Sequence, residues 1–126
     1  MTNPTDTLEA EIVAKGLTAP RITPGDIEAN IASESYFTAG DGVTGANVTF
    51  ANSIVYPSAL DLLTFCVLVL RNGFTVTGES ACASPENFNA EIGRKIAREN
   101  AVQKIWPLMG YELRSKLSTN EPAAAQ

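Results

Sequence analysis

The sequence predicts an α+β fold, in which a small antiparallel β-sheet built on a hairpin is packed by a long helix and by shorter flanking helices. Residues 62–70 are almost all apolar or β-favouring, and residues 74–77 alternate Phe or Val with Thr. Between these segments, Asn72-Gly73 suits the tight turn of a hairpin. Residues 84–106 then show a helix start and helical spacing of apolar residues. A hairpin that leads directly into a helix therefore organises the chain.

The turn also predicts a register for the hairpin. A two-residue turn of type I′ pairs Val69 with Val76. One face of the hairpin is then the core, and it carries Phe65, Val67, Val69, Phe74 and Val76. The other face carries Cys66, Leu68 and Leu70 beside Thr75, Thr77 and Glu79. Because this second face is half polar, we expect it to meet solvent, a partner or a ligand.

The long helix is predicted to begin at Ser84-Pro85-Glu86. Ser can cap the first backbone amides, Pro fits the first helical position, and Glu in the first turn complements the helix dipole. Pro107 is expected to kink this helix or to end it. The stripe predicted to cover the sheet comprises Phe88, Ile92, Ile96 and Ile105.

A second stripe on the same helix consists of small residues. Gly93, Ala97 and Ala101 repeat every four residues. A Gly inside a helix costs about 1 kcal/mol relative to Ala. The stripe therefore indicates the close approach of another backbone, which is either that of the hairpin or that of a symmetry-related helix.

The segment before the hairpin is predicted from local signals. Residues 5–15 suit a short helix, and Thr23-Pro24-Gly25-Asp26 is the capped start of a second helix that runs to about residue 38. Residues 39–53 are rich in Gly, Asn and Thr, which is typical of a loop or of an irregular strand near residues 48–50. This Gly-rich stretch lacks the spacing and the Lys of a phosphate-binding P-loop.

The last elements complete the predicted organisation. Residues 59–63 suit a helical turn before the first hairpin strand, and residues 108–117 suit a short final helix. The predicted division is an N-terminal helix and connector at 1–20, a single α+β domain at 21–117 and a disordered tail at 118–126.

Composition limits the function classes that the chain can serve. With 126 residues, of which 44% are hydrophobic, it can form one domain with a real core. The formal net charge of -5 argues against general nucleic-acid binding. The absence of His excludes Ser-His-Asp and Cys-His catalysis and His-bound zinc. We expect no cofactor, no metal and no membrane span, and we expect Cys66 and Cys82 to stay reduced.

Three consecutive segments carry a resemblance to a known family. TPGDIEANIASESYF, LTFCVLVLRNGFTVTGESACASPENFNAEIGRKIARENA and KIWPLMGYEL resemble the gene-49/gene-66 family of small conserved tailed-bacteriophage proteins. The resemblance covers most of residues 21–117, and the strings GESACASPENF and GRKIAREN are its most specific parts. It implies an accessory protein of unassigned role in the cytoplasm of the infected bacterial host, with no accepted catalytic residues.

The candidate ligand site lies where the hairpin enters the long helix. Amides at a helix N-terminus, Ser hydroxyls and the forked donors of Arg together suit an anion such as phosphate. The residues predicted to bind it are Ser80, Ser84, Asn87, Arg94 and Arg98. The alternative is a capped helix with a solvated basic face, whose two arginines pair with Glu91 or Glu99. Nothing in the spacing of the acidic residues selects a catalytic pair, so we expect no enzyme.

Two functional hypotheses of different classes follow. The first is a non-enzymatic accessory protein that sequesters a host nucleotide second messenger, of the cyclic oligonucleotide or cyclic ADP-ribose type, between the protomers of a homo-oligomer. It rests on the candidate phosphate site, on the small-residue helix stripe and on the phage setting. The second is an interaction module that inhibits or redirects a host protein through its acidic surface.

Overall fold

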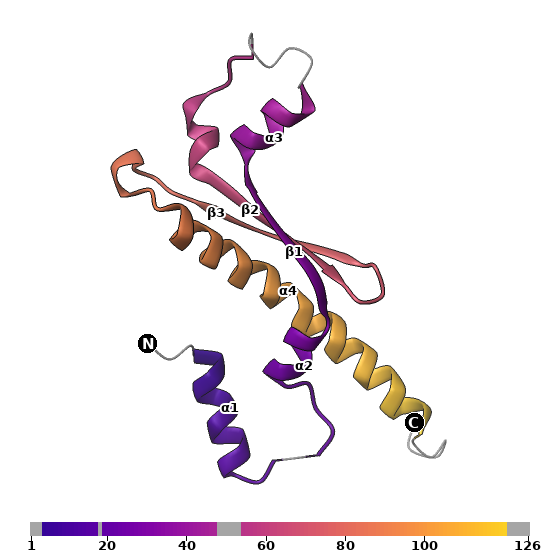
Figure 1. Cartoon of the computed structure of the whole chain (residues 1–126). Helices are drawn as coiled ribbons and strands as arrows, with labels where there is room; N and C mark the ends of the chain where they lie inside the picture. The colour runs from indigo at the N-terminus through magenta and orange to yellow at the C-terminus, as the bar shows by residue number, and fades with distance from the viewer. Residues whose placement is uncertain (1–3, 18, 48–53, 121–126) are drawn as a thin grey trace. The chain divides into compact units, whose positions relative to one another are not determined.

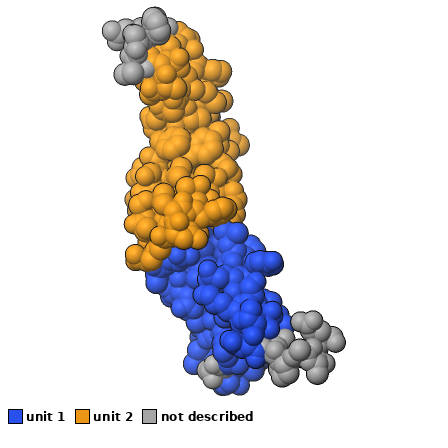
Figure 2. All heavy atoms as spheres, turned by 90° about the vertical axis from the view of Figure 1, so that its right-hand side faces the viewer, with its two compact units in different colours: residues 1–30, 105–126 blue, residues 31–104 orange. Residues whose placement is uncertain are grey.

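The computed structural model describes residues 4–17, 19–47 and 54–120. The chain divides into two compact units, which are residues 1–30 with 105–126 and residues 31–104 (Figure 2). The predicted boundaries at residues 20 and 117 stay a prediction. The elements, of which Figure 1 labels the α-helices and the strands, are α1 (Pro4–Ala14), α2 (Pro24–Ala29), β1 (Ile31–Thr38), α3 (Ala39–Ala46), η2 (Ser58–Leu62), β2 (Leu63–Leu70), β3 (Thr75–Ala81), η3 (Pro85–Asn87) and α4 (Ala90–Thr119).

The second unit is built on a three-stranded antiparallel sheet in the order β1-β2-β3. The fold class is therefore the predicted α+β class, with the hairpin as its centre and α4 along the sheet (Figure 1). The prediction of a helix running to residue 38 is wrong, because α2 ends at Ala29 and Ile31–Thr38 is the strand β1. β1 pairs along its length with β2. Its backbone N–H and C=O groups therefore make their hydrogen bonds to the neighbouring strand, whereas in a helix they would bond to each other.

The hairpin register differs from the predicted one by a single residue. Leu68 pairs with Val76, and the Leu70 amide donates to the Phe74 carbonyl at 2.8 Å. The loop therefore has three residues, with Gly73 at a φ of 90°. A type I′ turn needs a positive φ at both Asn72 and Gly73. Asn72 does not adopt a positive φ, and the loop is a three-residue loop with a left-handed Gly.

This one-residue difference exchanges the two faces of β2. The buried face carries Thr64, Cys66, Leu68 and Leu70 of β2 together with Val76 of β3. The predicted core face, with Phe65, Val67, Val69 and Phe74, is wrong. The three β2 residues of that set are half-buried on the opposite side of the sheet, where the Phe65 ring lies 5.6 Å from the Phe37 ring between centroids.

The long helix covers the buried face of the sheet with its small residues. Gly93, Ala97 and Ala101 are buried, whereas Ile92 and Ile96 are about half exposed. The predicted isoleucine stripe is therefore wrong at these two positions, although Ile105 is buried as predicted. The reason is that only small side chains allow the backbone of α4 to approach the backbone of the sheet closely.

The backbone that approaches the helix is that of the hairpin. A Cβ placed on Gly78 in β3 would overlap the carbonyl oxygen of Ala97 and the amide nitrogen of Ala101. Of the two neighbours considered for the small-residue stripe, the structure therefore shows the hairpin. The stripe is occupied within one chain.

The ends of α4 also differ from the predicted ones. The helix begins at Ala90, where the Asn89 side chain accepts from the Ile92 amide at 3.0 Å, and Ser84 instead starts the short helix η3. α4 continues through Pro107 to Thr119, so there is no separate final helix. Pro107 removes one hydrogen bond to the carbonyl four residues earlier, at Gln103, and that residue is exposed.

The Gly-rich segment is partly helical. Residues 39–46 form α3 instead of the predicted loop, because the Thr38 side chain and Asp41 make a capping box at its start. Gly40 is buried where a Cβ would overlap Tyr56 and Asp61, whose side chains share a 2.7 Å hydrogen bond. The helical turn predicted at residues 59–63 is confirmed as η2. The strand considered at residues 48–50 lies outside the described residues, as do residues 121–126 of the tail.

The first unit combines α1 and α2 with the C-terminal part of α4. The predicted first helix and the predicted capping box at Thr23 are confirmed. Arg21 donates two hydrogen bonds to the Glu9 carboxylate, at 2.9 and 2.6 Å, and this forked pairing lowers the pKa of Glu9. Among the described residues of this unit, the buried apolar side chains are those of Ile27 and Ile105.

The close approach at Gly78 predicts a strong effect of adding one methyl group. Gly78→Ala should lower the free energy of unfolding by about 3 kcal/mol, because the new Cβ meets the α4 backbone, which cannot move aside as a side chain can. The measurement is chemical unfolding of the two proteins. Gly110→Ala in α4 is the control, because nothing lies within 4 Å of a Cβ placed at Gly110. This change should raise the free energy of unfolding by up to about 1 kcal/mol. A Gly78→Ala variant as stable as the parent would contradict the packing.

Candidate functional site

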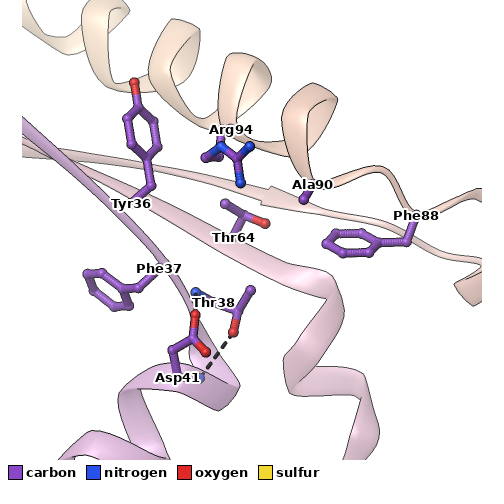
Figure 3. A pocket seen from close by; sticks show the side chains of 8 residues that line it. All are labelled: Tyr36, Phe37, Thr38, Asp41, Thr64, Phe88, Ala90 and Arg94. Atoms are coloured by element: carbon purple, nitrogen blue, oxygen red, sulfur yellow. Dashed lines mark hydrogen bonds between the residues drawn. The ribbon is translucent and has the colours of Figure 1, made fainter.

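A small pocket opens in the second unit, where the end of β1 and the start of β2 face the first turns of α4. Its volume is about 110 Å³, whereas small-molecule sites typically measure about 300–1,000 Å³. It can therefore enclose one chemical group of a ligand, such as a phosphate. The lining residues are Tyr36, Phe37, Thr38, Asp41, Thr64, Phe88, Ala90 and Arg94 (Figure 3).

Thr64 supplies an unusual polar group to this pocket. Its side chain is 3% exposed, and it is the one buried polar residue among those that the structure describes. Its hydroxyl makes no hydrogen bond to another described residue. Every polar side-chain atom of the described chain that is fully enclosed has a hydrogen-bond partner, so this hydroxyl is not fully enclosed. The hydroxyl therefore opens onto the pocket, where it can donate to a ligand.

Arg94 places a positive charge over the same pocket. It lies in the second turn of α4, and its guanidinium group points toward the pocket near Thr64 (Figure 3). Among residues 4–17, 19–47 and 54–120, it forms no ion pair. The helix N-terminus adds a further partial positive charge at this end of α4. The donors at this end of the pocket therefore suit an anion.

Asp41 brings a negative charge to the opposite side. Its carboxylate accepts from the Thr38 amide at 3.0 Å, and its own amide donates to the Thr38 hydroxyl at 3.1 Å (Figure 3). These bonds fix the carboxylate at the start of α3. A ligand in the pocket thus meets a cation at one side and an acceptor at the other.

A second polar group lies beside the pocket, on the side of β1 that faces α4. The Tyr36 hydroxyl donates to the Glu34 carboxylate at 2.9 Å, and Arg98 Nε donates to its other oxygen at 3.1 Å. Burial and then the hydrogen bond to Glu34 raise the pKa of Tyr36 to about 12. Burial also raises the pKa of the neighbouring Cys66 thiol.

The structure brings only some of the predicted site residues together. Arg94 lines the pocket, and Arg98 lies one turn further along α4, paired with Glu34. Ser80 lies in β3 and does not line the pocket. Ser84 makes no side-chain cap at η3, and Asn87 is exposed at the end of that element. The prediction that these five residues form one site stays untested, because no ligand is present.

The remaining pocket residues have no signal in the sequence. Thr38 ends a strand that the helical pattern hid, and Asp41 follows that strand in α3. Thr64 lies in an apolar run where a single Thr is ordinary. The considered pairing of an α4 arginine with Glu91 is replaced by a Glu91 to Lys95 ion pair at 3.3 Å. Within the described residues, no group of three acidic or Cys side chains could hold a metal ion, and no helix is long and apolar enough to span a bilayer.

The environment of Tyr36 predicts a shifted titration. Because its pKa lies near 12 in the fold against 10.0 for an ordinary phenol, the protonated phenol contributes stability below pH 10, and this contribution is lost as the pH rises from 10 to 12. Absorbance of the phenolate should show a tyrosine that titrates near pH 12, and Tyr36→Phe should remove it. The hydrogen bond to Asp61 also raises the pKa of Tyr56, and that shift should persist in the variant. Loss of an ordinary tyrosine in that variant would contradict the assignment.

Comparison with known proteins places the chain in a family. The model of the phage protein (N4 Gp49/phage Sf6 gene 66) family matches residues 22–117. No curated protein and no solved structure matches the chain. The matched range contains every pocket residue described above and covers well over half of the sequence. The chain therefore belongs to the phage protein (N4 Gp49/phage Sf6 gene 66) family.

Proposed function

We propose that this phage-family protein is a non-enzymatic binding protein that sequesters a phosphate-bearing host messenger of the cyclic oligonucleotide or cyclic ADP-ribose type. The observation that carries the proposal is that Thr64 and Arg94 both line one pocket. The buried Thr64 hydroxyl has no hydrogen-bond partner in the described chain, and the Arg94 guanidinium group has no ion-pair partner there. Such an arrangement supplies donors for phosphate oxygens.

The electrostatics of the pocket support a phosphate at its α4 side. A guanidinium group and a phosphate form charge-assisted hydrogen bonds, which are about twice as strong as neutral ones. The start of α4 contributes the positive end of a 30-residue helix. A phosphate oxygen bound by Arg94 lies next to the Thr64 hydroxyl, which gains the acceptor that the protein itself does not provide.

The size of the pocket determines what the rest of the site must be. At about 110 Å³ it encloses a phosphate but not a nucleotide, so most of such a ligand lies outside it. In the proposal, a second protomer covers this remainder. The small-residue stripe of α4 no longer supports that assembly, because β3 occupies it within the chain. The homo-oligomer therefore rests on the size of the pocket alone.

A second candidate function has its own observation. The sheet face away from α4 carries apolar side chains with hydroxyl residues on both sides. Its apolar members are Phe37, Phe65, Val67 and Val69. An apolar surface rimmed by polar residues is typical of a protein interaction site. This face favours the alternative of a module that binds a host protein.

The experiment is native mass spectrometry of the protein with cyclic di- and trinucleotides and cyclic ADP-ribose isomers. We expect a discrete oligomer that gains whole numbers of intact ligands. Arg94→Ala should weaken binding about ten- to a hundredfold, because it removes charged hydrogen bonds. Lys95→Ala removes the same charge from a side chain that is 74% exposed and paired with Glu91, and it should leave the affinity nearly unchanged.

Three results would count against the proposal. Equal effects of the two substitutions would show that the pocket does not bind the phosphate. A ligand of altered mass would indicate an enzyme. Absence of binding to every messenger would shift the weight to the host-protein candidate, for which a pull-down with the open sheet face substituted, for example Val67→Lys, is the corresponding test.

A further inference from the structure

Glu34 holds two donors that would otherwise serve an anion beside the pocket. Its carboxylate accepts from the Tyr36 hydroxyl at 2.9 Å and from Arg98 Nε at 3.1 Å. These donors come from two elements, β1 and α4, and they converge on the two oxygens of one group. A phosphate would use the same kind of donors in the same way.

The position of this cluster relates it to the pocket. Tyr36 lines the pocket, and its hydroxyl points toward α4 (Figure 3). Arg94 and Arg98 are four residues apart, which places their Cβ atoms about 5–6 Å from each other on one side of the helix. Two anion-binding groups therefore follow each other along α4. The first is open, and the second is filled by the chain's own carboxylate.

The hold of Glu34 on this second group is weak enough to be displaced. The side chains of Glu34 and Arg98 are 41% and 28% exposed, so solvent screens their attraction. β1 is an edge strand, so Glu34 has room to turn outward. A diphosphate ligand would replace the Glu34 carboxylate with a more highly charged acceptor while its other phosphate engages Arg94.

We propose that Glu34 is an internal competitor that occupies a second anion subsite, formed by Arg98 and Tyr36, and that a ligand with two adjacent phosphates displaces it. The inference rests on the proposed function, because it assigns the Arg94 pocket to the first phosphate. It makes the site selective, since a ligand with one phosphate gains only the open subsite. Glu34 is thus a residue that sets specificity by occupying donors.

The test is calorimetric titration with inorganic pyrophosphate, with orthophosphate as the single-phosphate probe. Glu34→Gln should strengthen pyrophosphate binding about two- to fivefold, in line with the strength of partly exposed ion pairs. It should change orthophosphate binding less. Glu91→Gln is the control, because it makes the same change in net charge at an α4 carboxylate that is 72% exposed.

A second comparison tests whether Glu34 acts through Arg98. In an Arg98→Ala background, the additional Glu34→Gln change should give no gain, because the donor that it releases is missing. Glu34→Ser, which resembles the neighbouring Ser33 and Ser35, should reproduce the gain in the unsubstituted background. A merely structural role of Glu34 would not produce a gain that depends on Arg98.

The outcomes separate this inference from the proposed function. If the parent binds pyrophosphate, Arg94→Ala weakens this binding and Glu34→Gln behaves like Glu91→Gln, the pocket stands and the competitor is overturned. Weaker binding by Glu34→Gln also overturns it, because Glu34 would then orient Arg98 for the ligand. If neither the parent nor Glu34→Gln binds pyrophosphate, both the pocket and the competitor are overturned.

Discussion

Direct backbone contact between β3 and α4 is the constraint on which the second unit depends. At Gly78 no side chain separates the strand from the helix, and Ala97 and Ala101 leave the helix surface equally bare. This contact sets how far α4 lies from the sheet and how it is rotated about its axis. With the small residues turned to the sheet, the positions one step round the helix, including Arg94 and Arg98, face β1. The polar groups of the candidate site are thus positioned by a packing contact that contains no polar side chain.

The same constraint affects the two sheet faces differently. The face under α4 is buried, and it carries Thr64, Cys66, Leu68 and Leu70 of β2 with Val76 and Gly78 of β3. At Gly78 no side chain fits between the strand and the helix. On the opposite face the exposed Phe37 ring lies beside the Phe65 ring, and Phe65, Val67 and Val69 are half-buried. That face therefore offers an apolar surface to a partner.

Sequence reasoning predicted the features that depend on neighbours along the chain. The hairpin, the capped start at Thr23 and the helical residues after the hairpin follow from a few residues each. The register of the hairpin does not follow from a few residues. The choice between a two- and a three-residue loop is set by strand pairing and burial, which Asn72-Gly73 does not specify. β1 was missed because Ile31, Tyr36 and Phe37 also suit a helical pattern. Only Arg94 of the five predicted site residues lines the pocket. Five of the other lining residues belong to β1, α3 and β2, and the pairing of the two strands that brings them to α4 cannot be deduced from local sequence.

For the proposed anionic ligand, the charge distribution favours local over long-range recognition. The chain has a formal net charge of -5, so its overall field repels an anionic ligand at a distance and gives no steering. Physiological salt screens that field beyond about 8 Å. Within this range a ligand meets Arg94 and the start of α4, but it also meets Asp41, and Glu34 lies beside the pocket. In the proposed function, binding must therefore come from well-placed donors at short range. A site of this kind would discriminate by the number and spacing of a ligand's acceptors, because negative charge alone also meets the repulsion of Asp41 and Glu34.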